Sequence, residues 1–162
     1  MKNGVFNLET WQLQDFSPDI ITCNKIPIAY IPGAYYEVTD RTLNKIAVHD
    51  KKTRSILEEF LGYILFRRNE FAAMFVLTGN GSNGKSSYLK IIRKLVGEFN
   101  TASLDLKELD QRFKTAELFG KLVNIGDDIS KSYIKESSVL KKLVTGETCK
   151  DPFDFTNYAK LI

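Results

Sequence analysis

Apolar residues recur at helical spacing in several stretches of this chain. The clearest stretch is residues 53–67, whose apolar side chains fall at i, i+1, i+4, i+5, i+8 and i+9, at Ile56, Leu57, Phe60, Leu61, Ile64 and Leu65. This spacing places them on one side of an α-helix and predicts an amphipathic helix. Residues 88–96 and 135–144 show the same period, and Gly97 follows the first of them where helices commonly end.

Other stretches of the chain are interpreted as strands and loops. Continuous apolar runs at 71–78 and 121–126 predict two buried strands, and weak alternation predicts a third strand at 159–162. Short mixed runs in residues 1–37 are interrupted by Gly4, Pro18, Pro27, Pro32 and Gly33, which favours loops with one or two short strands. Residues 108–118 are predicted to be helical from the apolar positions that they place on one side.

The predicted strand, glycine-rich loop and helix around residue 80 contain a known motif. Residues 79–86, GNGSNGKS, match G-x-x-x-x-G-K-[ST], which binds nucleotide phosphates when it joins a strand to a helix. Its glycines let successive N–H groups point at phosphate oxygens, and the following helix adds its positive end. Lys85 is expected to reach the β- and γ-phosphates, and Ser86 to ligate Mg²⁺. The expected cofactors are ATP and Mg²⁺, and the expected nucleotide-binding residues are Gly79, Asn80, Gly81, Ser82, Asn83, Gly84, Lys85, Ser86 and Ser87.

A second part of the site is expected directly after the strand at 121–126. This mainly apolar run leads into two carboxylates, Asp127 and Asp128. One carboxylate would hold Mg²⁺ and its neighbour would orient or deprotonate the attacking water. We assign Asp127 to the metal together with Ser86, and expect Lys85, Asp127 and Asp128 to be the catalytic residues. Taken alone, the acidic pair would be interpreted as a solvated turn, and the phosphate-binding motif is what favours the metal site.

Composition limits the class of protein further. A length of 162 residues suits one domain, or one domain with a small appendage, and 43% apolar with 27% charged residues is ordinary for a folded soluble protein. No apolar run approaches the ~18 residues that a membrane span needs, and the first residues lack the apolar region of a secretory signal. We therefore expect no membrane partner and a cytoplasmic location. Two cysteines and one histidine are too few for a disulfide framework or a zinc cluster.

Charge and exposed aromatic residues do not identify a partner. The net charge is only +3, and the chain has four short basic clusters, at residues 51–54, 67–68, 93–94 and 141–142. These clusters would suit a nucleic-acid backbone, but solvated helix faces are the favoured interpretation. Trp11, Tyr35 and Tyr36 would suit base stacking, although anchoring a small core is the commoner role.

Several longer stretches together resemble a known family. They read FVLTGNGSNGKSSYLKIIRKLVGEFN, LFGKLVNIGDD, LKKLVTGE and DPFDFTNYAKLI. In order and spacing they resemble the ATPase core of superfamily-3 helicases, specifically the phage and plasmid primase-helicases related to the poxvirus primase-helicase. The earlier stretch with NGVFNLETWQ and LGYIL resembles the small domain that precedes that ATPase. The resemblance implies an α/β fold, namely a P-loop NTPase with a modified AAA+ core at residues 69–162, and a small, mainly helical domain at residues 1–68.

The resemblance also implies a function. It is that of an ATP-binding and ATP-hydrolysing motor of a phage-type replicative DNA helicase and primase, which acts on single-stranded DNA and assembles into a hexameric ring in the full-length protein. The family's sensor residue and arginine finger would lie beyond Ile162. We therefore expect a motor fragment, truncated at its C-terminus, that is weakly active or inactive by itself. Two alternatives remain, a small P-loop phosphotransferase and a catalytically inert nucleotide-binding remnant.

Overall fold

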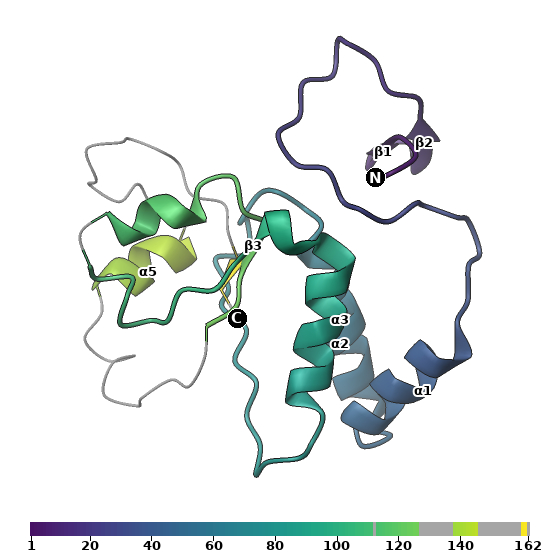
Figure 1. Cartoon of the computed structure of the whole chain (residues 1–162). Coiled ribbons are helices and arrows are strands. Elements are labelled where there is room, and N and C mark those ends of the chain that lie inside the picture. Colours follow the sequence, from purple (N-terminus) through teal and green to yellow (C-terminus); the bar gives the residue numbers. More distant parts are fainter. Residues whose placement is uncertain (112, 127–137, 146–159, 162) are drawn as a thin grey trace.

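A short parallel sheet lies between helices in the computed structural model, which describes residues 1–111, 113–126, 138–145 and 160–161 (Figure 1). Its strands are β3 (Thr101–Ala102), β4 (Val123–Asn124) and β5 (Lys160–Leu161), side by side in the order β3-β4-β5. The paired residues are Thr101 with Val123, Ala102 with Asn124, Val123 with Lys160, and Asn124 with Leu161. The strands predicted within 121–126 and 159–162 are confirmed by β4 and β5.

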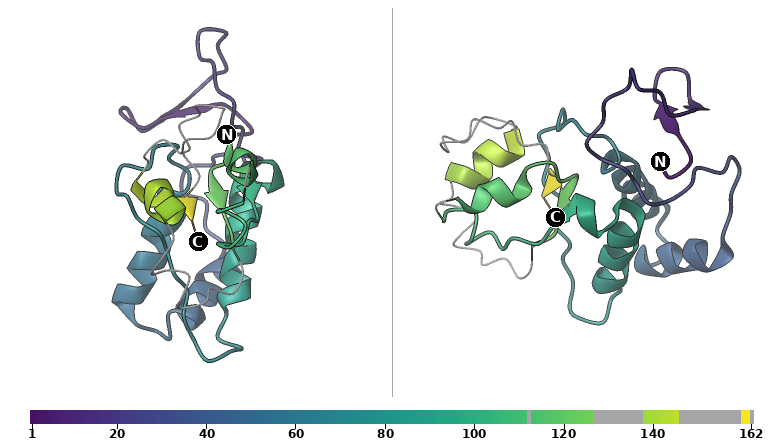
Figure 2. Two further views of the ribbon diagram at one scale, coloured as in Figure 1. Left: turned by 90° about the vertical axis from the view of Figure 1, so that its left-hand side faces the viewer. Right: turned by 45° about the horizontal axis from the view of Figure 1, so that its top comes forward.

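The two faces of this sheet belong to two separate apolar clusters. Successive residues of a strand point to opposite faces. Val123 accordingly packs in a first cluster with the helices that precede β3, while Ala102 packs in a second cluster with α5 (Ser138–Thr145). Figures 1 and 2 show α5 and α3 on opposite sides of the sheet in every view.

Three helices build the first cluster. They are α1 (Glu37–Ile46), α2 (Lys51–Tyr63) and α3 (Lys85–Val96). The buried side chains of this cluster are Ile26, Leu43, Ala47, Leu57, Phe60, Ile64, Tyr88, Ile92, Val96, Leu122, Val123 and Ile125. The helices predicted within 53–67 and 88–96 are confirmed, and each begins two or three residues earlier than the apolar pattern indicated.

A hydrogen bond inside the first cluster joins α2 to α3. The Tyr88 hydroxyl donates to the Leu57 carbonyl O at 2.7 Å, and the Tyr88 ring is fully buried. Burial raises the pKa of this hydroxyl, because the phenolate would lose its hydration. Burying an aromatic or branched apolar side chain of this kind contributes about 1.5–3 kcal/mol, so α3 is fixed to α2 along its inner face.

The second cluster packs α5 against the segment that follows β3. Its buried members are Ala102, Leu104, Leu106, Leu109, Leu118, Leu140 and Leu143. The Asn69 side chain attaches the chain after α2 to the last turn of α5, donating to the carbonyl O atoms of Leu143 at 3.3 Å and Val144 at 2.9 Å. The Tyr63 hydroxyl donates to Asn69 Oδ1 at 2.6 Å and thereby orients this amide. The helix predicted at 135–144 is confirmed over the part that the structure describes.

Two buried asparagines hold the ends of the strands. Asn124 exchanges two hydrogen bonds with the backbone of Leu104, accepting from its N–H at 2.8 Å and donating to its carbonyl O at 3.0 Å. Asn100, in the short 3₁₀ helix η1 (Glu98–Asn100), donates to the Val96 carbonyl O at 2.7 Å. These hydrogen bonds stabilise the fold, because a buried amide group without a partner would cost about 1–3 kcal/mol.

The amino-terminal segment contains an antiparallel hairpin. Its strands are β1 (Val5–Asn7) and β2 (Gln12–Gln14), and Figure 2 shows them away from the helices. The expectation that Trp11, Tyr35 and Tyr36 anchor a core is wrong, because these side chains are 73%, 72% and 69% exposed.

Two sequence-based predictions differ from the structure. The stretch 71–78 forms no strand and pairs with none of the described strands, although it alternates between the clusters, with Met74 in the second and Phe75 and Leu77 in the first. Where a helix was predicted at 108–118, residues 108–111 and 113–118 form turns and the 3₁₀ helix η2 (Lys114–Leu118) in place of an α-helix. Phe113 adopts φ +69°, a left-handed conformation that an α-helix cannot contain.

The sequence also contained elements that were not predicted. Helix α1 has only Leu43, Ile46 and Ala47 as an apolar stripe, which is too short to stand out. The acidic Glu37 in its first turn and Lys45 in its last turn were the available signals, because they complement the helix dipole. The first cluster contains side chains from both sides of residue 68, and the division into two domains there stays a prediction. Among the described residues, no helix is long and apolar enough to span a membrane.

Candidate functional site

The glycine-rich loop at residues 79–84 ends directly at α3. Gly84 is the residue before the first turn of the helix, at φ +87°, and its carbonyl O accepts from the Tyr88 N–H at 2.9 Å. Gly81 and Ser82 also have positive φ, at +83° and +45°. Glycine adopts this left-handed conformation without the steric cost that other residues carry, so the loop can turn sharply before the helix.

Backbone N–H groups of this loop and of the first three residues of α3 have no acceptor among the described residues. Within the described part of the chain, none of the N–H groups from residues 81–87 donates a hydrogen bond to a protein atom. Residues 79–83, Ser86 and Ser87 are exposed. The sequence of α3 carries no acidic residue that would offset its positive end. Unpaired N–H groups at a helix start are a suitable site for an anion such as phosphate.

Lys85 closes the loop in this structure. Its Nζ donates to the Gly79 carbonyl O at 3.0 Å and to Asn83 Oδ1 at 2.9 Å. The side chain is half-buried and lies back across the loop. The ammonium therefore links the start of the loop to Asn83, and on binding a phosphate it would exchange two neutral acceptors for charged ones.

Two glycines of the loop lie against side chains that a Cβ atom would displace. A Cβ atom at Gly79 would overlap the Asn83 side-chain amide. A Cβ atom at Gly84 would come within 2.7 Å of Ile46 Cγ1, on α1. By contrast, a Cβ atom at Gly81 would meet nothing within 4 Å. The loop is thus packed at both ends and open in the middle, as a site for a phosphate chain requires.

The predicted metal site is only partly described. Ser86 offers an exposed hydroxyl in the first turn of α3, which is the kind of oxygen that Mg²⁺ accepts. Asp127 and Asp128 lie outside the described residues, and the chain is described up to Gly126, two residues past β4. Among the described residues, no group of three His, Cys, Asp or Glu side chains is placed to hold a metal.

Sequence reasoning missed two residues near the loop. Ile46 contacts Gly84 from a helix that the apolar pattern did not predict. Arg54 belonged to a cluster interpreted as a solvated face, but its side chain is only 16% exposed and pairs with Asp40 at 2.9 Å and Glu58 at 2.6 Å. These hydrogen bonds and the two carboxylates raise the pKa of Arg54.

Comparison with known proteins identifies related sequences. A protein of Acanthamoeba polyphaga mimivirus, named Putative helicase L207/L206, is 30% identical over 100 residues, which are 60% of this chain and 10% of that protein. The chain thus spans about a tenth of this relative's length, and is distantly related to a protein named as a helicase. Residues 77–162, more than half of the chain, match the family described as Family of unknown function (DUF5906). The matched region includes the glycine-rich loop, α3 and all three strands of the parallel sheet, and the chain belongs to the DUF5906 family.

Proposed function

We propose that this chain is the ATP-binding and ATP-hydrolysing motor of a phage-type replicative DNA helicase, built as a P-loop NTPase with a modified AAA+ core. The observation that carries the proposal is the run of N–H groups at residues 81–87 that have no acceptor in the described part of the chain, in a loop that the Lys85 ammonium closes. This combination suits the phosphates of a nucleotide. The relationship to a protein named as a helicase supports the choice of motor over other phosphate-binding proteins.

The residues of the loop have distinct proposed roles. The N–H groups of residues 81–87 bind phosphate oxygens, and Lys85 leaves Gly79 O and Asn83 Oδ1 to bind the terminal phosphates. Ser86 provides a hydroxyl ligand for Mg²⁺. The metal, when bound, neutralises part of the charge on the phosphates.

The acidic pair has a proposed role in hydrolysis. Asp127 follows β4 and would act with Ser86 in holding Mg²⁺, while Asp128 would orient the attacking water or accept its proton. The support for this assignment is the sequence order, since a buried strand of the parallel sheet leads directly into the two carboxylates.

The proposed partners follow from the helicase relationship. We propose single-stranded DNA as the track and a hexameric ring as the assembly of the longer protein, working in the cytoplasm. The superfamily-3 and primase-helicase assignments rest on the resemblance of the sequence stretches, and the mimivirus relative supports only the broader helicase relationship.

The experiment that tests the proposal measures binding and turnover with the purified chain. Isothermal titration with Mg·ATP should show saturable binding that Lys85→Met weakens. Phosphate release should then be measured with and without single-stranded oligo(dT). The isolated chain is expected to hydrolyse ATP slowly, and a small increase with DNA supports the motor. Robust DNA-stimulated hydrolysis would refute the expectation that the chain is weakly active by itself. Absence of Mg·ATP binding would refute the proposal, and phosphate transfer to a small acceptor without any DNA effect would favour a phosphotransferase.

A further inference from the structure

The carboxyl-terminal end of α1 lies against the glycine-rich loop. Ile46, the last residue of α1, is the nearest neighbour of Gly84, and its Cγ1, Cδ1 and Cβ atoms would all come within 4 Å of a Cβ placed there. The turn after α1 and the loop at residues 79–84 both lie at the lower end of Figure 1. A helix from the amino-terminal part of the chain therefore contacts the backbone unit from which α3 begins.

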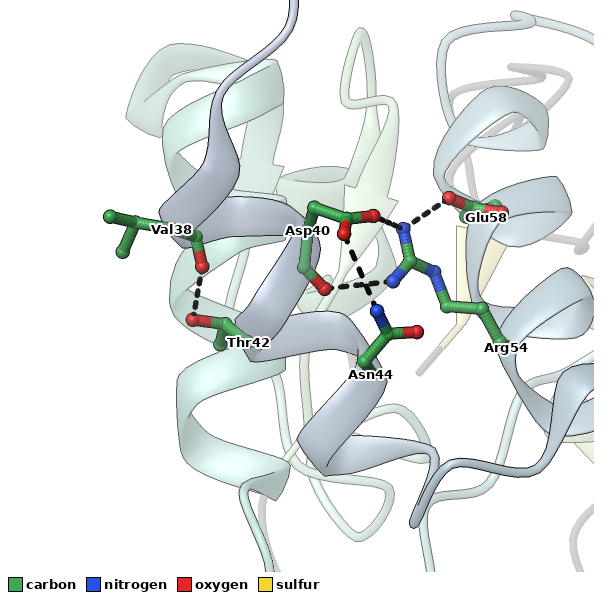
Figure 3. Close-up of polar contacts among 6 residues, drawn as sticks. All are labelled: Val38, Asp40, Thr42, Asn44, Arg54 and Glu58. Carbon is green, nitrogen blue, oxygen red and sulfur yellow. Dashed lines mark hydrogen bonds and ion pairs between the residues drawn. The ribbon is translucent and has the colours of Figure 1, made fainter.

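Helix α1 is held in this place by polar contacts from α2. Arg54 of α2 donates through Nη1 to the Asp40 carbonyl O at 2.8 Å and through Nη2 to Asp40 Oδ1 at 2.9 Å (Figure 3). The same Nη2 also donates to Glu58 Oε1 at 2.6 Å, and the Asn44 side chain donates to Asp40 Oδ2 at 3.4 Å. We call Arg54, Asp40, Glu58 and Asn44 the Arg54 network. Because Arg54 is largely buried, this network restrains α1 more than an exposed ion pair would.

Apolar contacts also restrain α1. Leu43 and Ala47 are 3% and 2% exposed and belong to the cluster that contains Tyr88 and Ile92 of α3. Ile46 packs at the edge of this cluster. The position of Ile46 is therefore set by α2 through the Arg54 network and by α3 through the core, and not by the loop itself.

We propose that Ile46 is a positioning residue of the nucleotide site. By packing on Gly84, it holds the left-handed backbone at the start of α3, and thereby the direction of the N–H groups at residues 85–87. This inference deepens the proposed function and rests on it. It implies that Mg·ATP affinity depends on the position of α1, through an apolar contact with the loop.

The coupling must act in both directions. If packing of α1 against Gly84 favours nucleotide binding, then bound nucleotide must favour this packing by the same factor. Hydrogen exchange of the α1 backbone should therefore slow when Mg·ATP binds to the wild-type chain. This measurement needs no substitution and does not depend on turnover.

The test combines this exchange measurement with a set of variants. Ile46→Ala removes the atoms nearest to Gly84 and should raise the Mg·ATP dissociation constant by about tenfold, within the usual range for coupled sites. Ile46→Val keeps a γ-carbon at this position and should stay within about twofold of wild type, since it loses only one methyl group. Arg54→Met should also weaken Mg·ATP binding. Arg41→Met should not, because Arg41 of α1 pairs with Glu37 in an exposed ion pair.

Controls separate positioning from general stability. Leu143→Ala leaves a cavity in the second cluster, which contains no residue of α1. It should lower the melting temperature with little effect on Mg·ATP affinity. The positioning role is refuted if Leu143→Ala weakens binding as much as Ile46→Ala at equal melting temperature, or if α1 exchange is unchanged by saturating Mg·ATP. If the wild-type chain binds no Mg·ATP at all, the proposed function itself fails, and the inference with it.

Discussion

Replacing Lys85 with methionine should weaken Mg·ATP binding strongly while leaving the fold intact. Methionine keeps most of the apolar stem and removes the ammonium. In the structure this ammonium donates to the Gly79 carbonyl O at 3.0 Å and to Asn83 Oδ1 at 2.9 Å. Nucleotide binding must replace these two neutral acceptors with phosphate oxygens. The substitution therefore changes the binding free energy by the difference between the hydrogen bonds of Lys85 with nucleotide bound and without it.

The size of this difference can be estimated from hydrogen-bond energies. Two bonds from Lys85 to phosphate join oppositely charged groups and contribute about 1.5–3 kcal/mol each, whereas the two exposed bonds to neutral acceptors that they replace contribute about 0.5–1 kcal/mol each. The net loss on substitution is therefore about 2–4 kcal/mol. This corresponds to a dissociation constant raised by roughly 30- to 1000-fold. The free energy of unfolding should fall by about 1 kcal/mol or less, because the lost bonds are at the surface.

The assay is isothermal titration of the wild-type and variant chains with Mg·ATP, with thermal melting of each. Lys90→Met is the matched control, since Lys90 is an exposed lysine of the same helix. It should bind as the wild type does. A Lys85→Met chain that binds Mg·ATP within about threefold of wild type would show that this loop is not the phosphate site.

Three further predictions concern stability and metal use. Tyr88→Phe removes the buried hydrogen bond to Leu57 and should lower the free energy of unfolding by about 1 kcal/mol. The pKa of Tyr88 is raised in the folded state, so the Tyr88 hydroxyl stabilises the fold fully below the ordinary tyrosine pKa and less at higher pH. The melting temperature of the wild type should therefore fall above about pH 10 more steeply than that of the variant. Hydrogen bonds from Thr53 lower the pKa of Asp50 at the start of α2, so Asp50→Ala should reduce the melting temperature at neutral pH, and the difference should disappear in acid as Asp50 itself becomes protonated. Asp127→Asn should keep most Mg·ATP affinity and shift the Mg²⁺ concentration needed for phosphate release, and an unchanged Mg²⁺ dependence would remove Asp127 from the metal site.

The candidate site illustrates what a contiguous motif can predict. The loop, Lys85 and the start of α3 are adjacent in the chain, so the sequence predicted their order and the direction of the helix without any tertiary contact. The structure places Lys85 across the loop, on Gly79 and Asn83, which the motif did not predict. Nor did it predict Ile46, because that contact joins residues 38 positions apart.

By itself, the sequence determined the elements whose stability is local. Helices α2 and α3 were predictable because the hydrogen bonds of a helix and its apolar stripe lie within a few residues. Tertiary structure alone decided the pairing order β3-β4-β5, the absence of a partner for the stretch at 71–78 among the described strands, and the burial of Arg54. The reason is physical: a strand exists only through hydrogen bonds to another strand, and Arg54 is buried because Asp40 of another helix provides a carboxylate and a carbonyl beside the local Glu58. Strand pairing and the contact with Asp40 depend on residues of other elements, about which the local pattern of apolar and polar positions carries no information.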